Sequence, residues 1–216
     1  MALFYFVRHG VSGWNAENRL CGRTDVPLSD EGRRQAARLA ERLRGLSPAA
    51  LYTSPLRRAV ETAEIITAAV RLTPVVEDRL IELDYGAWEG KTFAEVMEQD
   101  AEAFRAWDAD PGNVSPRGGE SGGQAMARVA PFLDELAARH PGEREHVIVV
   151  CHRTICRLIV CHALGLPPSE YRRRLSMDNA ALNIIQSMDK GWRLILLNDT
   201  SHLAPIHTET TLNGTF

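Results

Sequence analysis

The chain has 216 residues, 44% of them hydrophobic and 25% charged, which allows one well-buried core and is short for two. A net charge of -3 at pH 7 provides no basic surface of the kind that binds nucleic acid or an anionic membrane, and we expect neither partner. We predict a single domain over residues 1–203 and a polar tail over 204–216. No run reaches the length of a membrane span and no basic segment precedes the first apolar run, so we expect a cytoplasmic location.

Four cysteines are present, and three of them, Cys151, Cys156 and Cys161, cluster around a predicted junction between a strand and a helix. Neighbouring histidines suggest a metal site, but the spacing matches no usual zinc pattern. A chain of this size does not need disulfides to be stable. We therefore expect the thiols to be small buried hydrophobes, and we expect no metal and no cofactor.

The first predicted element is an apolar strand from Phe4 to Val7, which delivers Arg8 and His9 and then breaks at Gly10. The loop that follows is rich in groups that can contact a phosphate. Its candidate residues are Ser12, Asn15, Arg19, Gly22, Arg23 and Asp25. Ser29 is then placed to cap a helix that ends near Gly45.

A second short strand is predicted over residues 50–54, and Pro55 marks the start of the next helix. Arg57 and Arg58 fall in the first turn of that helix, just beyond the carboxyl end of the strand. A cation at a helix N-terminus opposes the helix dipole, so this placement calls for a compensating anion. In parallel α/β sheets, ligands bind at this end of the strands.

A further strand is predicted over residues 75–83, where Glu82 closes it. Thr92 and Glu95 have the spacing of a capping box that opens a short helix. The segment of about 91–123 then combines short helical patterns with a loop rich in Pro and Gly. We interpret it as a lid insertion over the carboxyl edge of the sheet.

A helix is predicted over residues 124–139, followed by a continuous apolar strand over 146–150. Such a run without alternation is typical of a central parallel strand that is covered on both faces. This strand delivers His152 and Arg153 into a helix start, as the first strand delivers His9. Residues 180–186 and 192–197 are predicted to form a hairpin.

If the first, second and 146–150 strands are parallel neighbours, Arg8, His9, Arg58 and His152 meet at one rim. Two guanidinium groups and one imidazolium can hold the oxygens of a phosphoryl group, which leaves the other imidazole free to attack phosphorus. The leaving alkoxide needs a proton from an acid of raised pKa. Glu82 is the candidate by position, and an ordinary solvated carboxylate is the alternative interpretation.

These motifs resemble the histidine phosphatase superfamily, in its phosphoglycerate mutase-like branch. The matching segments are Arg8-His9-Gly10 with Asn15, Ser54-Pro55-Leu56-Arg57-Arg58-Ala59, Leu80-Ile81-Glu82, Trp88-Glu89-Gly90, Gly119-Glu120-Ser121 and Val149-Val150-Cys151-His152. The resemblance implies an α/β fold, a three-layer α/β/α sandwich whose mostly parallel sheet has an antiparallel edge. It also implies that His9 is the phosphorylated nucleophile and Glu82 the proton donor, while Arg8, Arg58 and His152 hold the phosphate and Asn15, Cys21 and Gly22 line the pocket.

Within the superfamily, the chain is most similar to the bacterial metal-independent phosphoserine phosphatases. It departs from them at Tyr85, where those enzymes usually carry a histidine, and from many superfamily members at Cys21 and Arg153. The expected function is hydrolysis of a small phosphorylated metabolite, with phosphoserine or another carboxylate-bearing phosphate among the candidates. Tyr85 and Arg153, together with Arg23, His202 and the lid, are candidates for contacting the rest of the substrate.

Two other functions are compatible with the same motifs. A phosphoglycerate mutase would return the phosphoryl group to the substrate, but the segment between Glu82 and His152 is short for that group, which favours hydrolysis. A non-catalytic binding protein would typically have lost the nucleophile or an arginine, and neither is lost here. The edge of the late hairpin would also allow a homodimer.

Overall fold

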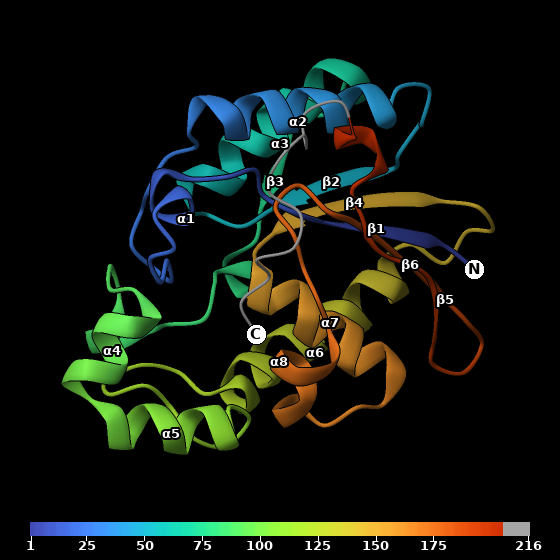
Figure 1. The fold of residues 1–216 in the computed structure, drawn as a ribbon. Coiled ribbons are helices and arrows are strands. Elements are labelled where there is room, and N and C mark those ends of the chain that lie inside the picture. The colour runs from blue at the N-terminus through green and yellow to red at the C-terminus, as the bar shows by residue number, and fades with distance from the viewer. Residues whose placement is uncertain (205–216) are drawn as a thin grey trace.

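A computed structural model describes residues 1–204, and most of the predicted polar tail lies outside the described residues. It contains a six-stranded sheet in the order β3-β2-β4-β1-β5-β6 (Figure 1). The strands are β1 (Leu3–Arg8), β2 (Ala50–Thr53), β3 (Val75–Val76), β4 (His146–Cys151), β5 (Leu182–Ser187) and β6 (Trp192–Asp199). The predicted strand over 50–54 and the predicted hairpin are therefore confirmed.

The central strands are parallel, and their register places the site. β4 lies between β1 and β2, with Arg8 opposite Cys151 and Thr53 opposite Val150. The residues that follow these strands therefore leave the sheet at one edge, which brings His9, Ser54 and His152 together. The apolar residues of β4 from Val147 to Cys151 are fully buried, as expected for a strand covered on both faces.

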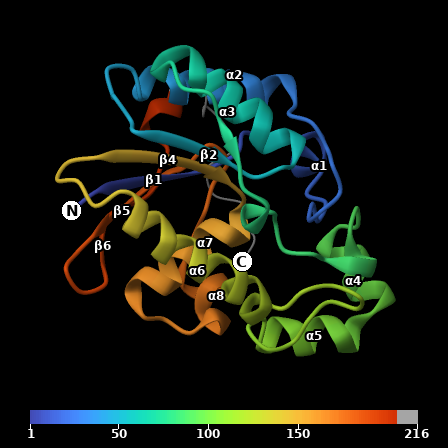
Figure 2. The ribbon, with the colours of Figure 1, turned by 180° about the vertical axis from the view of Figure 1, so that it is seen from behind.

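Helices cover both faces of the sheet, which confirms the predicted α/β sandwich (Figures 1 and 2). On one face, α2 (Asp30–Arg42) and α3 (Arg57–Val70) pack on a core that includes Val7, Ile148 and Leu182. On the other face, α6 (Gly122–Arg139) and α7 (Arg153–Leu164) pack on a larger core. The short helices α1 (Gly13–Ala16) and α8 (Tyr171–Arg174) lie in loops that border the site.

β5 and β6 form the antiparallel edge of the sheet. β5 pairs with β1 on one side and with β6 on the other, both in antiparallel orientation. β6 leaves Ile195 exposed at this end of the sheet. The homodimer suggested for this edge stays a prediction.

The strand predicted over 75–83 is wrong in its extent. Only Val75 and Val76 pair with β2, and a 3-10 turn over Asp78–Leu80 follows at once. The Glu77 side chain accepts a hydrogen bond from the Arg79 N–H and caps this turn, which ends the extended backbone. Glu82 therefore lies in a loop after the turn and not at a strand end.

The segment predicted as a lid contains α4 (Phe93–Gln99), which begins with the expected Thr92–Glu95 capping box, and α5 (Ala101–Ala109). Trp107 is fully buried and packs against Trp88 and Phe104 with ring centroids 5.4 and 5.8 Å apart. This cluster anchors the two helices beside the carboxyl edge of the sheet (Figure 1). A lid function for them stays a prediction. No helix within residues 1–204 is long and apolar enough to cross a membrane.

Candidate active site

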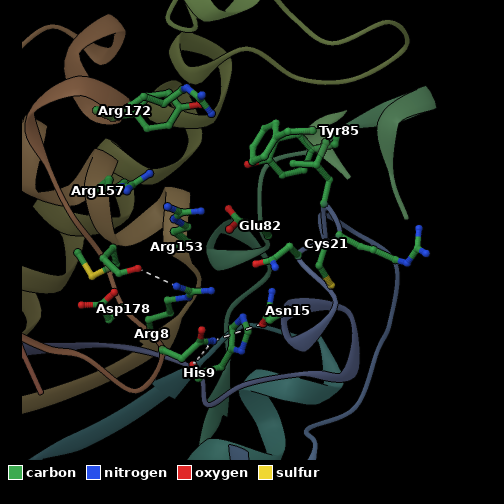
Figure 3. Close-up of a pocket in the computed structure, with 17 residues that line it drawn as sticks. Arg8, His9, Asn15, Cys21, Glu82, Tyr85, Arg153, Arg157, Arg172 and Asp178 are labelled. Atoms are coloured by element: carbon green, nitrogen blue, oxygen red, sulfur yellow. Dashed lines mark hydrogen bonds between the residues drawn. The ribbon is translucent and has the colours of Figure 1, made fainter. Parts of the chain in front are cut away.

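A cavity of about 230 Å³ opens where β1 and β4 end (Figure 3). Most of the site residues predicted from the sequence line this cavity or lie next to it. Those in its wall are Arg8, His9, Asn15, Arg19, Cys21, Glu82, Tyr85 and Arg153, while Arg58 and His152 lie directly behind His9.

His9 is held as a neutral imidazole with one unprotonated nitrogen. Its backbone is fixed because its N–H donates to the Cys151 carbonyl and its carbonyl accepts from the Ala180 N–H. Nδ1 lies 2.6 Å from the Gly10 carbonyl oxygen, which can only accept, so Nδ1 carries the proton and Nε2 has a lone pair. Burial, and then Arg58 and Arg8, hold the pKa of His9 well below its usual value. Nε2 is thus available as a nucleophile.

Arg58 fixes both the nucleophile and the loop around it. Its side chain is fully buried, and Nε donates to His9 Nε2 at 3.2 Å. Nη1 and Nη2 donate to the carbonyls of Thr24 and Gly22 at 2.9 and 2.6 Å. These acceptors compensate for a cation in the first turn of α3, where the helix dipole disfavours it.

His152 follows β4 and is the N-cap residue of α7. Its ring centroid is 5.1 Å from that of His9, and its Nε2 lies 2.6 Å from Ser54 Oγ. Nδ1 is buried and has no hydrogen-bond partner among the described residues. Burial, and then Arg58 and His9, hold the pKa of His152 well below its usual value, so these surroundings favour the neutral ring and not the imidazolium that we expected. An anion bound beside it would favour the charged form.

Arg8 brings a second guanidinium to the site. Nη1 donates to the Met177 carbonyl at 2.7 Å, whereas the buried Nε has no partner among the described residues. Burial, followed by the charges of Arg153 and Arg157, lowers the pKa of Arg8 to about 9. The charge of this arginine is therefore only partly compensated by the protein.

Glu82 is buried, with 3% of its surface exposed, so the alternative interpretation as a solvated carboxylate is wrong. Oε1 accepts from the Leu83 N–H at 2.7 Å and Oε2 from the Thr154 N–H at 3.1 Å. Burial raises the pKa of Glu82, and this effect outweighs the opposite effects of the two hydrogen bonds and of the nearby arginines. A raised pKa is what a proton donor near neutral pH requires.

The loop after His9 is tied to the site by short polar contacts. Asn15 forms a capping box with Ser12, and its Oδ1 also accepts from Asn179 Nδ2 at 3.3 Å. The Gly22 carbonyl accepts from Arg58, and a Cβ at Gly22 would lie 2.5 Å from the Leu83 carbonyl oxygen. Burial raises the pKa of the Cys21 thiol, which keeps it protonated.

The residues predicted to contact the rest of the substrate separate into two groups. Tyr85 is buried in the cavity wall with its hydroxyl 3.3 Å from Thr154 Oγ1, and Arg153 faces the same cavity. Arg23 instead pairs with Asp84 and Glu120 on the outside of the loop. His202 lies in the 3-10 turn over Ser201–Leu203, which packs against α2.

Several residues that line the cavity were not predicted from the sequence. Arg157 and Arg172 are the most prominent, and Tyr171, Asp178 and Asn179 also line the cavity. A signal for Arg157 existed, because it follows Arg153 by four residues on a predicted helix and must share its face. Arg172 had no such signal, because the packing of α8 against α7 and of its side chain on Phe93 and Trp107 brings it to the cavity.

Two neutral imidazoles, several guanidinium groups and a buried carboxyl of raised pKa around one cavity define a class of protein that binds and transfers phosphoryl groups. Residues 4–200 match the model of the histidine phosphatase superfamily (branch 1). The chain belongs to this superfamily, and it is a phosphatase.

Individual relatives agree with this assignment. The chain is 37% identical to phosphoserine phosphatase 1 of Hydrogenobacter thermophilus, over 97% of this chain and 98% of that protein. It is 34% identical to a metal-independent phosphoserine phosphatase of Arabidopsis thaliana, over 93% and 82% of the two chains. Among solved structures, the mycobacterial glucosyl-3-phosphoglycerate phosphatase in complex with VO3 is similar with a TM-score of 0.85 and 31% identity, over 92% and 99% of the two chains.

Proposed function

We propose that this protein hydrolyses phosphate monoesters of small metabolites through a phosphohistidine at His9, without a metal cofactor. The observation that carries the proposal is the pairing of an unprotonated His9 Nε2 with a buried Glu82 of raised pKa in one cavity. The shift of each pKa is in the direction that this reaction needs, toward an unprotonated nucleophile and a protonated acid.

In the first step, His9 Nε2 attacks phosphorus and the bond from phosphorus to the ester oxygen breaks. Glu82 gives its proton to the leaving alkoxide. In the second step, water attacks the phosphohistidine and gives a proton to the Glu82 carboxylate, and the N–P bond breaks. Inorganic phosphate leaves, and both side chains return to their starting states.

Charge on the transferred group is stabilised by fixed cations. Arg8 and Arg58 supply guanidinium donors, and His152 becomes a further donor when an adjacent anion favours its protonated form. The partial compensation of Arg8 by the protein is consistent with this role. Because these groups are already held in place, little reorganisation is needed as charge moves during transfer.

The proposed substrate is phosphoserine or another small phosphate that carries a carboxylate. The names of the relatives support phosphoserine, and the arginines near Tyr85 suit a carboxylate. Tyr85 contributes a bulky, neutral part of the wall. The bacterial metal-independent phosphoserine phosphatases usually carry a histidine at this position, so we expect the contact to the substrate to differ from theirs.

The experiment is a panel of phosphorylated metabolites assayed for release of inorganic phosphate, without a bisphosphoglycerate primer. We expect rapid release by the native protein and none by His9→Ala, while His162→Ala at the far end of α7 serves as the matched control. Transfer of phosphate between substrates without release would instead support a mutase. Equal turnover by His9→Ala would contradict the assigned nucleophile.

A further inference from the structure

Three arginines outside the proposed catalytic set gather in one wall of the cavity. Arg153 and Arg157 come from α7 and Arg172 comes from α8. Figure 3 shows the three following one another along this side of the cavity toward Arg8, with Glu82 and Tyr85 across from them. The same three arginines also line an adjoining cavity of about 200 Å³.

The protein leaves most of this charge without a partner. The side chains of Arg153 and Arg157 form no ion pair and no hydrogen bond within residues 1–204, and the Nε of each is buried without a partner. Arg157 is the more deeply buried of the two, with only 7% of its surface exposed. Burying an unpaired guanidinium is unfavourable unless an anion is bound during function.

Arg172 is partly compensated and rigidly placed. Its Nη2 donates to Asp108 at 2.9 Å, while its buried Nε has no partner among the described residues. Its guanidinium carbon lies 4.1 Å from the centroid of the Trp107 ring and 5.5 Å from that of Phe93. Stacking on these rings fixes the position of the cation before a ligand binds.

Acidic groups on this side of the cavity do not balance the cluster. Asp178 faces it, but one oxygen of Asp178 already accepts from Asn198 Nδ2 at 2.9 Å. Burial, followed by the charges of Arg153 and Arg172, lowers the pKa of Arg157 to about 10. Neighbouring cations repel one another and so disfavour the charged form.

We propose that Arg153, Arg157 and Arg172 form a second anion subsite, which holds an acidic group on the far side of the substrate from the phosphate ester. Preferred substrates are then phosphate monoesters that carry a second acidic group, either a carboxylate or another phosphoryl group. The inference rests on the proposed function and extends it, because it names the residues that select the substrate and the charge they select.

The test compares three substrates that share a three-carbon chain: propyl phosphate, 3-(phosphonooxy)propanoate and propane-1,3-diyl bisphosphate. We expect kcat/KM of the native protein to be at least about tenfold higher for one or both of the acidic compounds, given the strength of hydrogen bonds between charged groups. The compound with the larger preference identifies whether the carboxylate or the second phosphoryl group is the natural ligand. Equal kcat/KM for all three compounds would overturn the proposal.

Arg157→Gln should reduce this preference by about tenfold. Arg153→Gln provides a second variant, because Arg153 is less buried and its replacement disturbs the core less. Arg34→Gln is the matched control, since Arg34 is an exposed arginine that pairs with Glu31 on α2 and should leave the preference unchanged. An undiminished preference in both subsite variants would overturn the assignment of these residues.

Calorimetric binding of the same three compounds to His9→Ala separates this inference from the proposed function. If the native protein releases no phosphate from any compound, the proposed hydrolysis fails. The subsite is still supported if the acidic compounds bind more tightly than propyl phosphate, and it is refuted if they do not.

Discussion

At the scale of single residues, burial shifts the pKa values of the two central groups in opposite directions. It lowers the pKa of His9, which favours a lone pair on Nε2, and it raises the pKa of Glu82, which shifts that carboxyl group toward its protonated form. The same buried environment therefore favours an unprotonated His9 that can attack phosphorus and a protonated Glu82 that can give its proton to the leaving group. Two solvated side chains of the same types would need a lower pH to protonate the acid and a higher pH to free the base.

Glu82→Gln tests the proton donor. The amide keeps the size of the side chain but has no acidic proton, so poor leaving groups should suffer most. We expect kcat/KM to fall by about 10²-fold to 10⁴-fold for an alkyl phosphate and much less for p-nitrophenyl phosphate, whose phenolate leaves without protonation. Equal losses for both substrates would remove Glu82 as the general acid.

At the scale of elements, the site depends on how closely the loop after β1 approaches the start of α2. A Cβ at Gly10 would lie 2.3 Å from the Gly32 carbonyl oxygen, and one at Gly32 would lie 2.1 Å from the Val11 carbonyl oxygen. Each of these glycines therefore allows a backbone contact that any side chain would block. The carbonyl of Gly10 also accepts the hydrogen bond from His9 Nδ1, so a shift of this loop would disturb the orientation of the His9 ring.

Gly10→Ala tests this contact. The added methyl group meets backbone and not a flexible side chain, so the loop must move, at a cost of about 1–3 kcal/mol in the free energy of unfolding. Denaturant unfolding measures that cost, and phosphatase activity should fall with it. Gly13→Ala is the control, because a Cβ at Gly13 has nothing within 4 Å. A Gly10 variant as stable and active as the Gly13 variant would contradict the argument.

The parts of the fold that the sequence predicted well are those with a strong local signal. The unbroken apolar run of β4 and the caps at Ser29 and Thr92 were placed correctly. The 75–83 segment was not, because its residues favour extended backbone while the sheet offers partners to Val75 and Val76 alone. Local propensity could not reveal how many residues find a neighbouring strand.

Site residues, too, could be predicted only where the local sequence pattern fixed their position. His9, Arg58 and His152 could be brought together because each follows or flanks a strand, and parallel strands end at one edge. Arg172 could not, because its place depends on an aromatic cluster contributed by α4 and α5. Residues positioned by tertiary packing alone leave no periodic signal in the sequence.

At the scale of the whole molecule, the protein has a net charge of -3, whereas several arginines line its cavity. Most surface arginines are paired, as in Arg79 with Glu77 and Glu135. We therefore expect the unpaired guanidiniums in the cavity wall to attract small anions to one place on an otherwise acidic protein.

Stability should depend on pH through the buried histidines. The pKa values of His9 and His152 lie well below the usual 6.5, so the unfolded chain binds more protons than the folded chain once the pH falls below that value. The free energy of unfolding should then decrease by about 1.4 kcal/mol per histidine for each pH unit. Glu82, whose pKa is raised, acts in the opposite direction, but it is one group against two.

Thermal unfolding at pH 6.5 and pH 5.5 measures this effect, and we expect a lower Tm at the lower pH. Inorganic phosphate should raise Tm at both values, because the proposed phosphate site exists only in the folded chain. An unchanged Tm between the two pH values would show that the histidines are not neutral in the folded protein.

The central claim is that the phosphoryl group passes through His9. The most direct measurement is rapid quenching of the protein during turnover in base, where phosphohistidine survives, followed by mass spectrometry of its peptides. We predict one added phosphoryl group on the peptide that contains His9, labile to acid and missing from His9→Ala. A phosphoryl group on another residue, or turnover without any covalent intermediate, would contradict the account.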